Sequence, residues 1–165
     1  SANMLSAETV AGQYPVHTVL TMAKIAENAE ENINYAKRFT RYEFKIRNEV
    51  DALSHATCAM AIDLQAKAIV ACTMSGMTAR MVSRFRAPAV IIGMTTNPKI
   101  WRKLALSWGV VPVMAEEFTS PDVLFYEAKR TAKKVLSLKK GDFVVITGGI
   151  PNGPGSTNLI KIEKI

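Results

Sequence analysis

Residues 67–94, KAIVACTMSGMTARMVSRFRAPAVIIGM, contain the pattern that decides the fold class. An apolar run at 67–72 is followed by a polar turn, by a segment with helical spacing at 79–86, and by a second apolar run at 89–94. Short continuous apolar runs are typical of strands that are buried on both faces of a sheet. We therefore interpret this stretch as a strand–helix–strand unit.

The same alternation continues toward the C-terminus. We expect a helix at 97–106, a strand at 109–114, a helix opened by Ser120-Pro121-Asp122, a strand at 143–146 and a more alternating final strand at 158–162. Strands that alternate with helices at this interval form βαβ units with right-handed crossovers. The fold class is therefore α/β: a three-layer α/β/α domain whose mostly parallel five-stranded sheet has its final strand at an edge.

The N-terminal part of the chain has a different character. Pro15 suits the first turn of a helix, and apolar residues recur after it at helical spacing. A basic, aromatic segment at 37–46 is expected to be an irregular connector anchored by its aromatic side chains. Asn48 then caps a second helix.

Composition and charge narrow the class of protein. The chain has 165 residues, enough for one domain, and a net charge of +7 that suggests nucleic-acid binding. No RNA- or DNA-binding motif accompanies the basic stretches, so we expect no nucleic-acid partner.

No apolar run reaches about 18 residues and no signal peptide is visible, so we expect a cytoplasmic protein without a membrane partner. Cys58 and Cys72 are expected to be reduced core residues.

The turn after the first apolar run is a candidate phosphate site. It consists of Thr73, Met74, Ser75, Gly76, Met77 and Thr78. Ligands of such sheets bind beyond the carboxyl ends of the strands, where helix N-termini attract anions and short hydroxyl side chains donate hydrogen bonds. The same hydroxyls are also suited to simple helix capping. Residue spacing leaves both interpretations open.

A second unusual loop spans residues 147–157. Four of its eleven residues are glycines and two are prolines. A plain hairpin connection needs only two to five residues, so this loop is unusually long. We interpret it as a ligand clamp with Gly153, Gly155, Ser156 and Thr157 as candidate contacts, although a simple connector remains the alternative.

Several kinds of site find no support. Neither loop matches the nucleotide-hydrolysing phosphate loop, and no dinucleotide fingerprint follows the first strand. His17 and His55 fall within predicted helices without a cluster of metal ligands around them. Glu116 and Glu117 form an adjacent pair that is more typical of solvated surface than of a Mg²⁺ site. We therefore expect no catalytic residues, metal or cofactor in this domain.

Motifs in a fixed order show a resemblance to a known family. They are the segments 4–9 and 12–15, Thr73-x-Ser-Gly-x-Thr-Ala79, Arg84-x-Arg-Ala-Pro88, Thr95-x-Asn-Pro98, Lys140-Gly-Asp142 and the glycine-rich segment 147–158. In this order and over nearly the whole chain, they resemble the C-terminal, allosteric domain of bacterial pyruvate kinases. Residues 1–14 are then a remnant of the preceding barrel domain or residues added for expression, and 15–165 are the C-terminal α/β domain.

The resemblance implies a function. Pyruvate kinases are glycolytic phosphotransferases that move phosphate from phosphoenolpyruvate to ADP with Mg²⁺ and K⁺, in a barrel that this chain lacks. The C-terminal domain is implied to bind an effector and to help build a homotetramer. By position, the phosphate would lie on Thr73, Ser75, Gly76 and Thr78, with 153–157 as the effector loop.

Animal pyruvate kinases that respond to fructose bisphosphate resemble this chain in the 73–78 loop. At the positions of Met74 and Met77, however, those enzymes carry basic side chains. We therefore expect a sugar monophosphate, AMP, or inorganic phosphate or sulfate as the ligand. Two alternatives remain open: a free-standing phosphometabolite sensor and a nucleic-acid-binding module.

Overall fold

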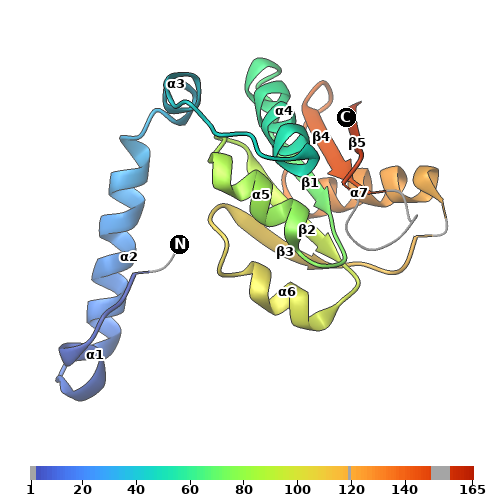
Figure 1. Ribbon diagram of the computed structural model, residues 1–165. Helices are drawn as coiled ribbons and strands as arrows, with labels where there is room; N and C mark the ends of the chain where they lie inside the picture. Colours follow the sequence, from blue (N-terminus) through green and yellow to red (C-terminus); the bar gives the residue numbers. More distant parts are fainter. Residues whose placement is uncertain (1–2, 119, 150–156) are drawn as a thin grey trace. The chain divides into compact units, whose positions relative to one another are not determined.

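The computed structural model describes residues 3–118, 120–149 and 157–165, and the chain forms two compact units, Ser1–Tyr35 and Ala36–Ile165 (Figure 1). The first unit contains α1, Ala7–Ala11, and α2, Pro15–Glu31. The helix start at Pro15 is confirmed. No residue of these two helices is buried.

The second unit is built on a five-stranded sheet. Its strands are β1 (Ala68–Cys72), β2 (Val90–Thr95), β3 (Val110–Met114), β4 (Phe143–Gly148) and β5 (Leu159–Lys164). Their order is β3-β2-β1-β4-β5, with the first four parallel and β5 antiparallel to β4. The predicted fold class is confirmed, including the edge position of the last strand.

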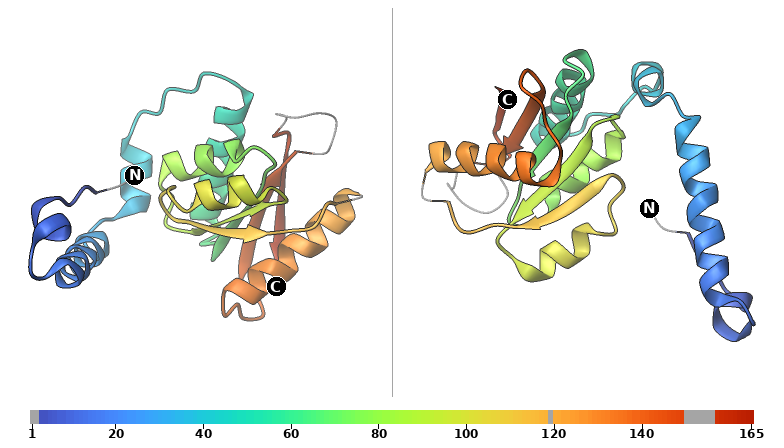
Figure 2. Two further views of the ribbon diagram at one scale, coloured as in Figure 1. Left: turned by 90° about the horizontal axis from the view of Figure 1, so that it is seen from below. Right: turned by 180° about the vertical axis from the view of Figure 1, so that it is seen from behind.

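Helices cover both faces of this sheet (Figure 2). α4 (Glu49–Asp63), α5 (Met77–Phe85) and α6 (Pro98–Leu104) lie on one face, and α7 (Pro121–Val135) lies on the other. Successive side chains of a strand point to opposite faces, so each strand contributes to two cores. In β1, Ile69 packs with the first group of helices and Val70 packs with α7.

Three helices of this unit begin at polar caps. Asn48 Oδ1 accepts a hydrogen bond from the Asp51 N–H, Asn97 Oδ1 from the Lys99 and Ile100 N–H groups, and Ser120 Oγ from the Val123 N–H. Each cap satisfies backbone donors that the first helical turn leaves without a partner. The predicted starts of α4, α6 and α7 are therefore confirmed.

The prediction of an irregular connector at 37–46 is partly wrong. Its first half forms α3, Tyr35–Arg41. The Phe39 ring stacks on His55 of α4 with 4.9 Å between centroids, and Phe44 lies 4.8 Å from Phe85. The predicted anchoring by aromatic side chains is confirmed, and burial of Phe39 stabilises a helix whose own sequence signal is weak.

Lys129 of α7 contacts two residues of β5. Its Nζ donates to Glu163 Oε2 at 3.2 Å and to the Lys164 carbonyl at 2.8 Å, so α7 is joined to the edge strand β5. The hydrogen bond from Lys161 lowers the pKa of Glu163 below its ordinary value.

Cys58 and Cys72 are free and buried, as predicted. Among the described residues, no helix is long and apolar enough to span a bilayer.

Candidate functional site at the carboxyl edge of the sheet

Threonines gather where the central parallel strands end. β1 is followed by Thr73, β2 ends at Thr95, and Thr147 lies one residue before the end of β4. Thr95 and Thr147 are buried. Because these strands are parallel and adjacent, their carboxyl ends meet at one edge, which is where ligands of such sheets bind.

The loop at 73–78 is held by its own hydroxyl groups. Thr73 Oγ1 accepts a hydrogen bond from the Gly76 N–H at 2.9 Å, and Ser75 Oγ accepts one from the Met77 N–H at 3.3 Å. Gly76 has a φ of +79°, which favours glycine, and α5 begins directly after it. These contacts agree with the capping interpretation. A hydroxyl that accepts such a bond still has its O–H to donate, so capping leaves room for an anion.

The two loops singled out in the sequence meet in the structure. The hydroxyl oxygens of Thr78 and Thr157 lie 2.6 Å apart, and both side chains are buried. Gly153, Gly155 and Ser156 lie outside the described residues. Thr157 is therefore the part of the glycine-rich segment that is placed beside α5.

Neither methionine of the loop is packed away. The side chains of Met74 and Met77 are 65% and 42% exposed. The six residues of the loop include no charged side chain. Any charged side chain that favours an anion here must therefore belong to a neighbouring element.

One neighbour was not predicted. A Cβ atom placed on Gly76 would lie 3.0 Å from Ile100 Cγ2 and 3.4 Å from Leu104 Cδ2, so α6 packs directly against the loop. Gly76 itself is buried. No local sequence signal reveals this contact, because it joins two successive βα units.

The ionisable residues singled out in the sequence belong to several different elements. His17 is in α2, and His55 is stacked among aromatic rings in α4. Glu116 and Glu117 are exposed. Within the described ranges, no group of three His, Cys, Asp or Glu residues could hold a metal ion.

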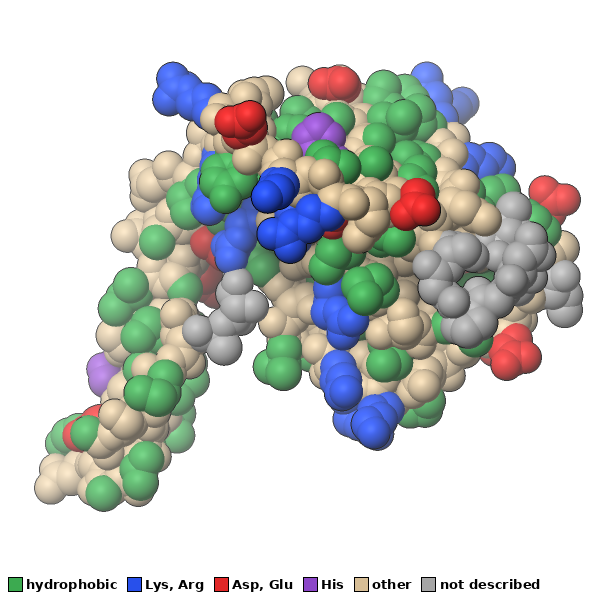
Figure 3. All heavy atoms as spheres, in the orientation of Figure 1, with side chains coloured by type: hydrophobic (Ala, Val, Ile, Leu, Met, Phe, Trp, Pro, Cys, Tyr) green, Lys and Arg blue, Asp and Glu red, His purple; other side chains and the backbone are tan. Residues whose placement is uncertain are grey.

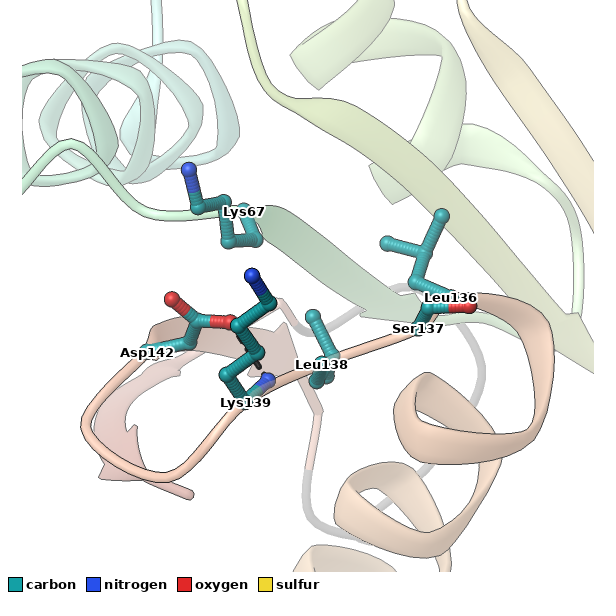
Figure 4. A pocket seen from close by; sticks show the side chains of 6 residues that line it. All are labelled: Lys67, Leu136, Ser137, Leu138, Lys139 and Asp142. Carbon is teal, nitrogen blue, oxygen red and sulfur yellow. Dashed lines mark hydrogen bonds between the residues drawn. The ribbon is translucent and has the colours of Figure 1, made fainter.

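A crevice of about 400 Å³ lies at the other ends of the strands, where β1 and β4 begin (Figure 4). It is lined by Lys67, Leu136, Ser137, Leu138, Lys139 and Asp142, and Asp142 Oδ2 accepts a hydrogen bond from the Lys139 N–H at 2.7 Å. Lys67 and Asp142 directly precede β1 and β4, so the crevice is at the amino ends of these strands. It contains none of the predicted site residues.

Comparisons with known proteins assign this architecture to a family. Residues 51–163 match the family described as "Pyruvate kinase, alpha/beta domain". The chain is 43% identical to a pyruvate kinase of Clostridium acetobutylicum, over 99% of this chain and 35% of that protein. It is 40% identical to one of Staphylococcus saprophyticus, over 99% of this chain and 28% of that protein. The chain thus spans about a third of the length of these curated relatives.

Proposed function

The chain belongs to the pyruvate kinase family as its C-terminal α/β domain, and on this basis we propose that it binds a phosphorylated metabolite at the 73–78 loop and regulates catalysis elsewhere in the enzyme. The bond between Thr78 and Thr157 carries the proposal, because it brings the two candidate binding loops to one edge. Phosphate bound there would receive hydrogen bonds from the hydroxyls of Thr73 and Ser75 and from the amides of the first turn of α5.

The strength of such a site is adequate for regulation. Hydrogen bonds to a charged group contribute about 1.5–3 kcal/mol each, so three or four support micromolar to millimolar affinity after ordering costs. Allosteric coupling needs only about 1–3 kcal/mol of difference between two states. A sugar monophosphate or AMP suits a loop without basic side chains.

The remaining parts of the proposal concern the whole enzyme. The complete protein would transfer phosphate from phosphoenolpyruvate to ADP in a catalytic barrel of the same chain, with Mg²⁺ and K⁺, as a cytoplasmic homotetramer. This domain would contribute an oligomer interface and no catalytic group. The chain should then form no ATP from phosphoenolpyruvate and ADP.

A binding experiment tests the site. Calorimetric titration of the chain with AMP, glucose 6-phosphate and inorganic phosphate should show saturable binding of at least one of them. Ser75→Ala should weaken it by about tenfold, because one charge-assisted hydrogen bond is lost. Ser137→Ala, at the opposite edge of the sheet, is the matched control and should bind like the unmodified chain. Equal affinities for all three proteins would show that Ser75 of the 73–78 loop does not contribute to ligand binding, and would contradict the proposed site.

A further inference from the structure

The net positive charge of this chain comes from one part of its sequence. Residues 64–115 contain seven Lys and Arg residues and no Asp or Glu. The other fourteen Lys and Arg residues are balanced by all fourteen Asp and Glu residues. The entire net charge of +7 therefore falls within 52 consecutive residues.

This acid-free segment forms one side of the domain. It comprises β1, α5, β2, α6 and β3, and it includes the whole 73–78 loop. Three of its cations have other roles or positions: Lys67 lines the crevice at the opposite edge, Arg84 pairs with Asp51, and Arg86 lies over the Trp108 ring.

The other four cations are exposed residues of two successive helices. They are Arg80 of α5 and Lys99, Arg102 and Lys103 of α6, and we call them the α5–α6 basic face. Within the described part of the chain, none of them forms an ion pair with a carboxylate. The residues outside it include no Asp or Glu. In Figure 3, Lys and Arg side chains gather over the region where α5 and α6 lie.

The basic face borders the candidate loop. The Arg80 N–H donates to the Gly76 carbonyl at 3.1 Å, so Arg80 is one helical turn from the loop. Ile100 and Leu104 pack against Gly76, and Lys99 and Lys103 directly precede these two residues in α6. The loop has no charged side chain of its own, and these cations are thus close in the sequence to residues that form it or contact it.

We propose that the α5–α6 basic face attracts anionic ligands to the 73–78 loop with a force that grows with their negative charge, while the contacts within the loop itself suit a monophosphate. This inference rests on the proposed function, because it concerns how the same site selects its ligand. Exposed charges act on one another over about 10 Å at 0.1 M salt, so contact with the phosphate is not required. Fields of this kind raise association rates by about 10- to 1,000-fold at low ionic strength.

Charge reversal on α6 tests the inference. In Lys99→Glu/Lys103→Glu, the dissociation constant for AMP should rise about three- to tenfold at about 50 mM salt, and the difference should shrink at about 300 mM. The constant for fructose 1,6-bisphosphate should rise further, because that ligand carries more charge. The control is Lys133→Glu/Lys134→Glu, two exposed positions of α7 on the other face, which changes the net charge by the same amount.

The outcomes separate the two proposals. A larger effect of the α6 pair than of the α7 pair, lost at high salt, is the expected result. Binding by the unmodified chain with equal effects of both pairs, or with none, overturns this inference and leaves the proposed function intact. If the unmodified chain binds none of the phosphorylated probes, both proposals are wrong.

Discussion

Thr78 and Thr157 are 79 positions apart in the sequence, yet their hydroxyl oxygens lie 2.6 Å apart in a buried contact. Thr78 is in the first turn of α5, and Thr157 is the last residue of the glycine-rich loop, which precedes β5. The contact connects the two loops at the carboxyl edge of the sheet. It is therefore the first contact to test for stability.

We expect Thr78→Val to destabilise the chain by about 1–3 kcal/mol, because the buried Thr157 hydroxyl then loses its partner. The double variant Thr78→Val/Thr157→Val should recover part of this loss, since neither buried group then lacks a hydrogen bond. Urea unfolding of the four proteins gives the coupling free energy. Additive effects of the two substitutions would contradict the contact.

A second prediction concerns Gly76, whose φ of +79° and contact with α6 both disfavour a side chain. Gly76→Ala should destabilise the chain by about 1–2 kcal/mol through backbone strain, with a further loss from the clash with Ile100. The control is Gly109→Ala, because Gly109 has a φ of +67° and its nearest neighbour would be 4.0 Å from the new Cβ. Equal unfolding free energies for both variants would show that α6 does not press on the loop.

A third prediction concerns the ion pair between α4 and α5. Arg84 Nη1 lies 2.8 Å from Oδ1 of Asp51, whose side chain is 3% exposed. Arg84→Met should destabilise the chain by about 2–3 kcal/mol, less than the ~3–5 kcal/mol of a fully buried pair because Arg84 is 36% exposed.

The matched control for this pair is the exposed contact between Arg130 and Glu127 on α7. Arg130→Ala should change the free energy of unfolding by less than about 0.5 kcal/mol. Chemical denaturation of both variants measures the difference. A loss of similar size in the two would show that burial of Asp51 has no energetic consequence.

The fourth prediction is a dependence of stability on pH. Burial raises the pKa of Cys58 and of Cys72 from 9.0 to about 12. Between about pH 9 and pH 12 the unfolded thiols lose their protons while the folded ones keep theirs, so the unfolded state gains stability as pH rises. The unfolding free energy should fall by up to about 1.4 kcal/mol per pH unit for each thiol.

Denaturation between pH 8 and about pH 10.5 measures this slope. Cys58→Ala should reduce the slope by the contribution of one thiol. The substitution also changes the unfolding free energy by a constant amount, which does not depend on pH and so does not affect the slope. Contributions that are common to both proteins cancel in the comparison. Identical slopes would mean that the Cys58 thiol ionises as easily in the folded chain as in the unfolded one.

Local patterns were sufficient to predict most of the secondary structure. The apolar runs at 67–72 and 89–94 became buried parallel strands because uninterrupted apolar side chains suit a strand that is covered on both faces. Asn48, Asn97 and Ser120 marked helix starts because capping needs only a hydroxyl or amide within three residues. α3 was missed because Phe39 is stabilised by His55 and Phe85, which are distant in the sequence.

The sequence also predicted a candidate site, since glycines and hydroxyls directly after a strand indicate the carboxyl ends of the strands of a parallel sheet. It did not show that Thr78 meets Thr157 or that α6 packs on Gly76. Both contacts depend on the strand order, which puts β1 between β2 and β4 and so brings their following segments together. Periodicity and capping reflect free energies within one helix or strand, whereas strand order depends on the packing of the whole core. That packing therefore decides which loops and helices lie side by side.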